Sequence, residues 1–338
     1  MENPYRGNPE TQFFHKRETS GDENFDTQVV AKYRRGRPNE DSFIGKNGYT
    51  HEEVEADLDD IRGKQEEIFS REGEGATQMF YGVMEGIAKH GWLGESTENR
   101  TIEVVQTSRY DDVKNGVDFT VVIHEKGRPP IVIGIDATSM EDPFKLEQKL
   151  LRSINGVKHG QLTPLKYYRY KGVASPKGFT IPRGVIGANA ENAKRMAESM
   201  VDATAKENPV QHALLQELEG QFRAQLSAAI EAYRRHGEST HDEPEVLNRL
   251  EEWEDGLTEA VEDTGLSEAE TATFNELLAE VRKSFAEGTN VYGKNLKRLA
   301  EVVGYIANIR MEKSASVSQD AFKDDRTVQV LKHPRRAA

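Results

Sequence analysis

The segment Ile131–Thr138 is a nearly unbroken run of apolar residues, and it restricts the possible folds of this chain more than any other feature. A strand that is apolar on both sides must be covered on both faces, as strands of α/β proteins are. The preceding segment, Val117–His124, instead alternates with a period of two, which is typical of a strand. Together these segments predict a sheet with helices packed against it.

The order of predicted elements defines the fold class. Helical periodicity runs from a capping box at Thr50–Glu53 to about residue 70. After it we expect a helix over 77–90, strands over 102–105, 117–124 and 131–138, a helix over 142–154 and a strand over 165–170. Asp142 and Pro143 suit the first turn of the helix over 142–154. This order predicts an α/β fold with a small central mixed sheet flanked by helices.

Beyond Gly187 the pattern is helical almost to the end, with breaks at Asn208-Pro209, Gly237–Pro244, Gly265 and Gly288. Ser267–Glu270 is a second capping box. The helices are expected to form a bundle or an extended arm. The predicted domains are a disordered arm (1–48), an α/β core (49–184), an acidic all-α region (185–316) and a disordered tail (317–338).

Composition excludes several classes of protein. The chain has no cysteine, so a disulfide framework, a thiolate zinc site and a cysteine nucleophile are excluded. It has no apolar stretch of the ~20 residues that a membrane span requires, and its N-terminus has no apolar signal segment. These features predict a soluble cytoplasmic protein that does not contact membranes.

Charge is unevenly distributed along the chain. The net charge is −13, but residues 145–183 contain nine Lys or Arg and one acidic residue, Glu147. Residues 185–316 contain 25 acidic and 14 basic residues. An acidic average disfavours nucleic-acid binding, whereas a local basic segment permits it. The acidic helical region is expected to form a homodimer, bind a protein partner or restrict access to the basic face.

Two carboxylates lie where an isolated charge would be costly. Asp118 lies one residue into a predicted strand, and Asp136 closes the run Ile131–Asp136. A charge in a sheet layer usually pairs, caps a loop or holds a cation. If the two strands are neighbours, the side chains can converge and bind a divalent metal through oxygen. A structural pair or a loop cap is the alternative.

These residues resemble the core of the PD-(D/E)XK nuclease superfamily over about residues 77–171. The resemblance rests on Tyr110–Asp118, with Gly116-Val117-Asp118 opening the second strand, and on Ile133–Thr138 ending the third. It implies the same element order, Asp118 and Asp136 as ligands of Mg²⁺ or Mn²⁺, and hydrolysis of phosphodiester bonds. Asp112 would be a further acid near the metal, and Glu85 would be the acid of the first helix. The alternatives are that Asp112 lies in an ordinary turn and that Glu85 is exposed to solvent. For each residue this alternative is favoured over a role in the site.

The family's lysine is missing from its usual place, where this chain has Thr138. Members of the superfamily sometimes carry this lysine on the following helix. That helix has a basic stripe of Lys145, Lys149 and Arg152. We expect Lys149 to replace the lysine, with Lys145 and Lys166 as further candidates, and Thr138 to hydrogen-bond a metal-bound water at most. An ordinary solvated helix face is the alternative for the stripe.

A basic segment follows, in which cations alternate with tyrosines. We expect it to contact phosphates, with the aromatic rings as stacking platforms. Packing of the tyrosines against a helix is the alternative. The expected nucleic-acid contacts are Lys145, Arg152, Lys158, Lys166, Arg169 and Lys171, interleaved with Tyr167, Tyr168 and Tyr170.

The sequence therefore predicts a metal-dependent nuclease acting on DNA. Two alternatives stay open. One is a nuclease-fold module that binds nucleic acid without cutting it, because the third-strand lysine is absent. The other is a structural or assembly protein that acts through its helical region.

Overall fold

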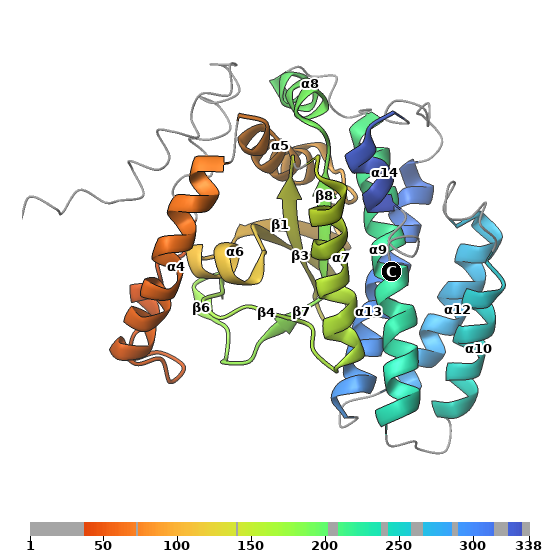
Figure 1. Ribbon diagram of the computed structural model, residues 1–338. Coiled ribbons are helices and arrows are strands. Elements are labelled where there is room, and N and C mark those ends of the chain that lie inside the picture. The colour runs from red at the N-terminus through yellow and green to blue at the C-terminus, as the bar shows by residue number, and fades with distance from the viewer. Residues whose placement is uncertain are drawn as a thin grey trace, which may run out of the picture.

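The computed structural model describes residues 37–71, 74–139, 141–201, 209–237, 243–257, 266–285, 290–313 and 324–332. A four-stranded mixed sheet lies at the centre, with helices packed around it and a helical region following it (Figure 1). The predicted α/β fold class is thereby confirmed. Within the described ranges, no helix is both long and apolar enough to cross a membrane.

The central sheet has the strand order β1-β2-β3-β8. Strands β1, β2 and β3 are antiparallel neighbours, and β8 runs parallel to β3. The third strand has the predicted bounds. The strands are β1 (Arg100–Gln106), β2 (Phe119–Glu125), β3 (Ile131–Thr138) and β8 (Arg183–Gly187).

The predicted strand over 165–170 is wrong. The fourth strand of the sheet is β8, so the predicted domain boundary after residue 184 cuts through a central strand. Residues 163–181 instead form short two-stranded ladders, because Leu165, Tyr167 and Tyr168 bury their side chains in separate clusters. The ladders pair β4 (Thr163–Pro164) with β7 (Thr180–Ile181), and β5 (Arg169–Tyr170) with β6 (Val173–Ala174).

Two helices cover the opposite faces of the sheet. Helix α5 (Glu74–His90) packs Phe80 against Phe119 of β2, with 5.9 Å between the ring centroids. Helix α7 (Pro143–Lys158) packs Leu146 against Val185 of β8. Asp136 of β3 pairs in register with Val185, so it lies on the α7 face. The α7 face is where the candidate site forms.

The start of α7 is confirmed, but its end was predicted too early. The Asp142 side chain accepts hydrogen bonds from the first turn, and Pro143 takes the first helical position. Beyond the predicted end at residue 154, the helix continues to Lys158. Burial of Val157 offsets the weak helix propensity of the residues before it.

Residues 1–48 were predicted to be disordered. For residues 37–48 this prediction is wrong, because they are ordered in the structure. A 3₁₀ helix, η2 (Glu40–Phe43), is followed by α4 (His51–Arg71). Phe43 is fully buried against Tyr167. Residues 1–36 lie outside the described residues.

A short helix, α6 (Arg109–Asn115), was not predicted. Ser108 caps its start, accepting a hydrogen bond from the Asp111 backbone. Gly116 ends it in the left-handed conformation, with φ 65°. The helix therefore delivers the chain to Asp118 through a fixed turn.

The C-terminal helices form a bundle that packs against the sheet rather than an extended arm (Figure 1). Apolar residues of the sheet and of this bundle belong to one continuous core cluster. The predicted capping box at Ser267 and Glu270 is confirmed. The bundle contains α9 (Pro209–His236), α10 (Glu243–Asp255), α12 (Glu268–Ser284) and α13 (Val291–Lys313), whereas α8 (Ala190–Val201) packs on α5, and α14 (Arg326–Lys332) packs on α7, α9 and β8.

The last helix corrects the predicted disordered tail. Leu331 of α14 is fully buried, and it packs with Leu146 and Leu150 of α7 and with Val185 of β8. Within 317–338 the structure describes residues 324–332, and the rest of this range lies outside the described residues. The α14 helix thus closes the α7 face of the sheet.

Candidate functional site

Asp118 lies at the entrance to β2, between two fully buried neighbours, Val117 and Phe119. Its backbone N–H donates to Ile135 O at 2.8 Å. Its Oδ2 accepts a hydrogen bond from the backbone N–H of Ala137 at 2.7 Å. Phe119 pairs with Ile135, so Asp118 lies beside Asp136 on the neighbouring strand. The two carboxylates therefore meet at one end of the sheet.

Asp136 forms an ion pair with Lys149, the residue expected to replace the missing lysine. Lys149 Nζ donates to Asp136 Oδ1 at 2.8 Å across the gap between α7 and β3. Burial disfavours the ammonium form, but Asp136 and Asp118 outweigh this effect and raise the pKa of Lys149 above its ordinary value. Lys149 is consequently a fixed positive charge at the site.

Arg183 of β8 was not predicted as a site residue. In the structure its side chain is almost fully buried beside Asp136. Its guanidinium donates to Lys149 O on α7 at 2.9 Å and to Asn115 O of α6 at 2.9 Å. Its Nη1 atom lies 4.0 Å from Asp136 Oδ2. Burial lowers the pKa of Arg183 despite the nearby carboxylates. Arg183 thus joins β8, α7 and α6 around Asp136.

A third carboxylate, Asp112 of α6, faces Asp118. Arg37 Nη2 donates to Asp112 Oδ2 at 2.8 Å. Burial, the Asp112 carboxylate and the Asp136 carboxylate together raise the pKa of Asp118 well above its ordinary value. The structure therefore brings Asp112, Asp118 and Asp136 together, as a crowded group of acids bordered by cations.

Thr138 and Glu85, the other two candidate site residues, are both buried. Thr138 is buried at the end of β3, two residues after Asp136 and therefore on the same face of the strand. Glu85 was expected in solvent, which is wrong: the residue is 1% exposed and forms an ion pair with Lys89. Helix α5 packs against both the sheet and α8, so little of its surface is left to solvent.

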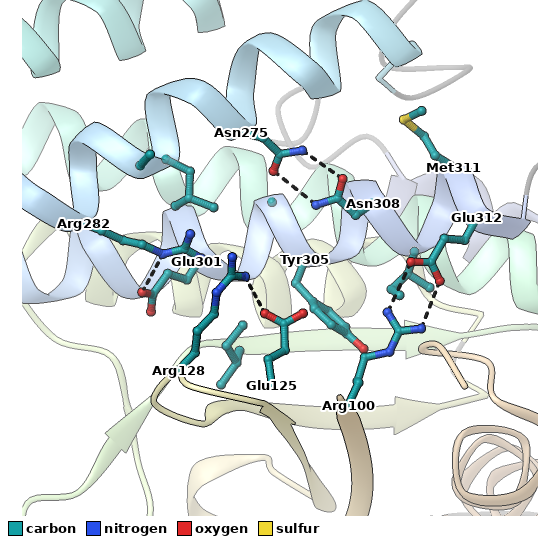
Figure 2. Close-up of a pocket in the computed structure, with 15 residues that line it drawn as sticks. Arg100, Glu125, Arg128, Asn275, Arg282, Glu301, Tyr305, Asn308, Met311 and Glu312 are labelled. Atoms are coloured by element: carbon teal, nitrogen blue, oxygen red, sulfur yellow. Dashed lines mark hydrogen bonds and ion pairs between the residues drawn. The ribbon is translucent and has the colours of Figure 1, made fainter. Parts of the chain in front are cut away.

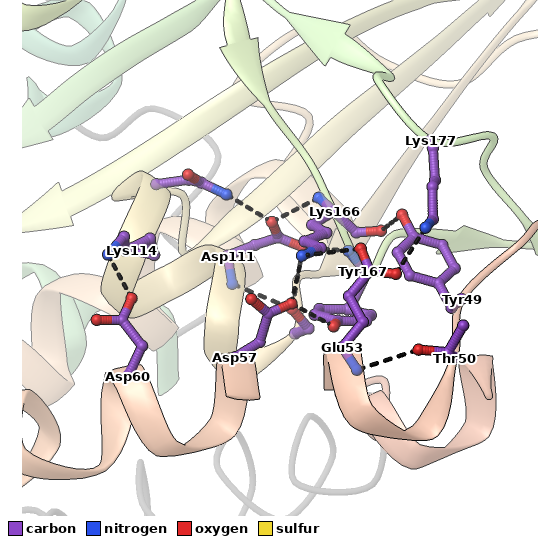
Figure 3. A network of polar contacts seen from close by, with 12 residues as sticks. Tyr49, Thr50, Glu53, Asp57, Asp60, Asp111, Lys114, Lys166, Tyr167 and Lys177 are labelled. Carbon is purple, nitrogen blue, oxygen red and sulfur yellow. Dashed lines mark hydrogen bonds and ion pairs between the residues drawn. The ribbon is translucent and has the colours of Figure 1, made fainter. Parts of the chain in front are cut away.

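The basic segment is largely neutralised by α4 (Figure 3). Lys166 lies 3.2 Å from Glu53 and 2.5 Å from Asp57, and Lys177 lies 2.6 Å from Glu53. The acids of α4 hold the pKa of Lys166 above its ordinary value, although partial burial opposes them. This cluster is an internal salt-bridge network rather than an open phosphate-binding surface.

Other residues of the segment also have internal contacts. Arg169 donates to Ser42 O at 3.1 Å, and Lys171 pairs with Glu103 at 2.8 Å. Tyr167 and Tyr168 are buried, which makes them unsuitable as stacking platforms for bases. Tyr170 stacks on His124. The packing alternative therefore describes these tyrosines better than the predicted platform.

Four of the expected nucleic-acid contacts remain on the surface, one of which is Lys171. Lys145, Arg152 and Lys158 are exposed along α7, the helix that supplies Lys149. Lys145 has a long contact of 3.9 Å with Asp142. Three of these four exposed positive charges follow α7, and the fourth, Lys171, lies in the segment over 163–181.

Asp111 is a buried acid that the sequence interpretation passed over. Its side chain accepts hydrogen bonds from the backbone N–H groups of Lys166 and Tyr167, at 2.7 and 2.9 Å (Figure 3). Burial raises the pKa of Asp111 in spite of these donors. The feature of the sequence that could have indicated a role for Asp111 is its position directly before the candidate acid Asp112. Asp111 anchors α6 to the segment over 163–181, and thereby fixes Asp112.

A separate cavity of about 700 Å³ lies between the sheet and helices α12 and α13 (Figure 2). Its arginines are paired with carboxylates: Arg100 with Glu312, Arg128 with Glu125 and Arg282 with Glu301. Asn275 and Asn308 exchange hydrogen bonds across it. The charged and polar groups of this cavity are therefore paired with each other. Asp112, Asp118 and Asp136 do not line it.

Asp118 and Asp136 place carboxylate oxygens on neighbouring strands. Within the described ranges, no group of three or more His, Asp or Glu side chains is placed so that it could hold a metal ion. Mg²⁺, however, commonly binds through one or two carboxylates and keeps several waters. The unfavourable charge on Asp118 is the feature that a cation would relieve.

The arrangement can perform acid–base and electrostatic chemistry on an anionic substrate. Lys149 supplies a positive hydrogen-bond donor, and the two aspartates supply negatively charged oxygen atoms. Comparison of the chain with models of protein families, with curated proteins and with solved structures found no match.

Proposed function

We propose that this protein is a metal-dependent nuclease that hydrolyses phosphodiester bonds in DNA. The observation that carries the proposal is the 2.8 Å contact between Lys149 Nζ and Asp136 Oδ1, with Asp118 on the adjacent strand. A lysine from a helix thereby reaches the carboxylate that ends the third strand. This arrangement is consistent with a lysine displaced from the position of Thr138.

The order of elements supports the same proposal. Helix α5, strands β1 to β3, helix α7 and strand β8 follow the order helix, three strands, helix, strand. This is the order of the PD-(D/E)XK core that the sequence resembles. The candidate residues lie at corresponding places: Asp118 opens the second strand and Asp136 lies near the end of the third.

In the proposed mechanism, Asp118 and Asp136 hold Mg²⁺ or Mn²⁺. When bound, the metal supplies Lewis acidity and lowers the pKa of a coordinated water. Lys149 stays protonated and donates a hydrogen bond to the attacking water or to a non-bridging phosphate oxygen, where negative charge develops. Arg183 keeps the Lys149 backbone and Asp136 in place through its contacts.

The exposed cations of α7 support a polyanionic substrate. Lys145 precedes Lys149 by one turn, and Arg152 follows it by nearly one turn. A phosphate chain crossing this helix would meet positive charge on both sides of the reacting bond. DNA binding is expected to weaken as the salt concentration rises.

The test is cleavage of fluorescently labelled single-stranded and duplex DNA with Mg²⁺, with Mn²⁺ and with a chelator. Lys149→Gln is expected to lower the cleavage rate by roughly 10²- to 10³-fold, because a donor to developing charge is lost. Lys145→Gln is the matched control, since it removes an exposed lysine from the same helix. It is expected to weaken binding and to leave the chemical step unchanged.

Equal cleavage by the wild type and Lys149→Gln would contradict the assignment of Lys149. Chelator-resistant cleavage would contradict the metal requirement.

A second candidate function is binding of nucleic acid without cutting. It is favoured by the ion pair between Arg37 and Asp112, which supplies the acid group with a positive charge from the protein itself. A site neutralised in this way has less need of a metal. Salt-sensitive DNA binding without cleavage under any metal condition would support this alternative.

A further inference from the structure

Arg37 has an unusual position for a residue that precedes the first described helix. Its side chain is 10% exposed, and its guanidinium donates to Asp112 Oδ2 at 2.8 Å. The two residues are 75 positions apart in the sequence. An arginine is thus carried from the N-terminal segment into the edge of the candidate metal site.

The carboxylates of the site have unequal partners. Asp136 has two nearby cations, Lys149 at 2.8 Å and Arg183 at 4.0 Å. Arg37 contacts Asp112, and Asp112 in turn faces Asp118. The Arg37 guanidinium therefore supplies positive charge on the side of the site where Asp112 and Asp118 repel each other.

We propose that Arg37 competes with the divalent cation for this acid group, so that metal binding requires Arg37 to leave Asp112. The inference rests on the proposed metal site and adds a means of regulating it. A cation held by Asp118 and Asp136 would lie close to the Arg37 guanidinium on the neighbouring Asp112, and the two cations would repel each other, strongly where water is excluded. Bound metal and paired Arg37 therefore destabilise each other.

The local structure allows Arg37 to move without unfolding its neighbours. The next element, η2, is held independently: Glu40 accepts a hydrogen bond from the Tyr110 backbone N–H at 2.9 Å, and Phe43 is fully buried. Arg37 lies before these anchors. Rotation of its side chain, or a shift of residues 37–38, can open the site while Asn39 still caps η2 and α4 stays in place.

The test is calorimetric titration of Mn²⁺ into the full-length protein and its variants. Arg37→Gln is expected to bind Mn²⁺ more tightly than the wild type, by a factor between about 5 and 150, the usual range of coupling between sites. Arg37→Lys keeps the positive charge and is expected to stay close to the wild type. Arg195→Gln removes an arginine from an exposed ion pair on α8 and serves as the control for net charge.

The outcomes separate this proposal from the function on which it rests. Tighter binding by Arg37→Gln alone supports the competition. Equal Mn²⁺ affinity of the wild type and Arg37→Gln, with both folded by circular dichroism, overturns the role of Arg37 and leaves the metal site intact. If neither protein binds Mn²⁺, both proposals fail. Tighter binding by Arg195→Gln to the same degree would attribute the effect to overall charge and overturn the proposal.

Discussion

Asp118 and Asp136 are adjacent carboxylates with opposite electrostatic surroundings. Asp136 contacts Lys149 directly and lies near Arg183. Asp118 accepts a hydrogen bond from the Ala137 backbone and faces Asp112. The same substitution at the two positions should therefore have opposite effects on stability when no metal is present.

Asp118→Asn is expected to raise the free energy of unfolding at pH 7 by about 1 kcal/mol, because it removes a buried charge that its neighbours repel. Asp136→Asn is expected to lower it by about 2 kcal/mol, since Lys149 loses its partner; the value is below that of a fully buried pair because Lys149 is 29% exposed. Urea unfolding in the presence of a chelator measures both effects.

The sign of the pH dependence follows from the raised pKa of Asp118. The folded state binds the proton more tightly than the unfolded state, so the contribution of Asp118 to stability is fully present below its ordinary pKa of 3.8. This contribution is lost as the pH rises through the folded pKa. The advantage of Asp118→Asn over the wild type should accordingly grow with pH. An advantage that is independent of pH would contradict the assigned surroundings.

Gly116 is the residue that lets Arg183 approach the site. A Cβ at this position would lie 2.6 Å from Arg183 Nη1 and 3.4 Å from Asp136 Oδ2. Gly127 has a similar positive φ, but a Cβ there would meet nothing within 4 Å. The two glycines therefore separate backbone strain from steric displacement of the guanidinium.

Gly127→Ala is expected to cost about 1 kcal/mol of stability, which is the strain of the left-handed backbone. Gly116→Ala should cost roughly 1–3 kcal/mol more, because overpacking adds to the same strain. Chemical denaturation of both variants measures the difference. Equal losses would mean that Arg183 yields freely and does not fix the site.

At the scale of elements, the sequence predicted those with a strong apolar period. Strand β3 has its predicted bounds, and Asp142 with Pro143 located the start of α7. Strand β8 was missed because glycines interrupt it. Gly184 has no side chain there because a Cβ would lie 2.5 Å from Leu218 of α9.

Other elements escaped prediction because distant partners stabilise them. Helix α6 is short and polar, and its Asp111 is held by the backbone of Lys166 and Tyr167. Helix α14 is marked in the sequence by few apolar residues, yet it completes the cluster on α7. Lys149 was predicted from the basic stripe, whereas Arg183 was missed because no local pattern indicated its burial.

The contribution of α14 can be measured through Leu331. Leu331→Ala should lower the free energy of unfolding by about 2–4 kcal/mol, since a fully buried side chain is removed from the cluster with Leu146 and Val185. Arg326→Ala on the exposed side of the same helix is the matched control, with an expected change below about 0.5 kcal/mol. Similar small losses for both would show that α14 does not hold this face.

At the scale of the whole molecule, the α/β part and the helical region share one core. Apolar residues from α5, β2 and β3 and from α9, α12 and α13 belong to the same cluster. Helix α9 packs against β8 and α7 as well as against α13. The acidic helical region is thus a structural support of the sheet, in addition to any partner that it binds.

This shared core predicts that the protein unfolds as one unit. Differential scanning calorimetry should show a single transition whose calorimetric and van't Hoff enthalpies agree. Two separate transitions would instead support independent α/β and helical domains.

The central claim is that Asp118 and Asp136 hold one divalent cation beside Lys149. Anomalous diffraction from crystals of the wild-type protein grown with Mn²⁺ tests it most directly, because the signal locates the ion without requiring the correct substrate. We expect an anomalous peak between the two carboxylates, absent from crystals of Asp118→Asn. A wild-type site without the peak, with Lys149 still paired to Asp136, would contradict the claim.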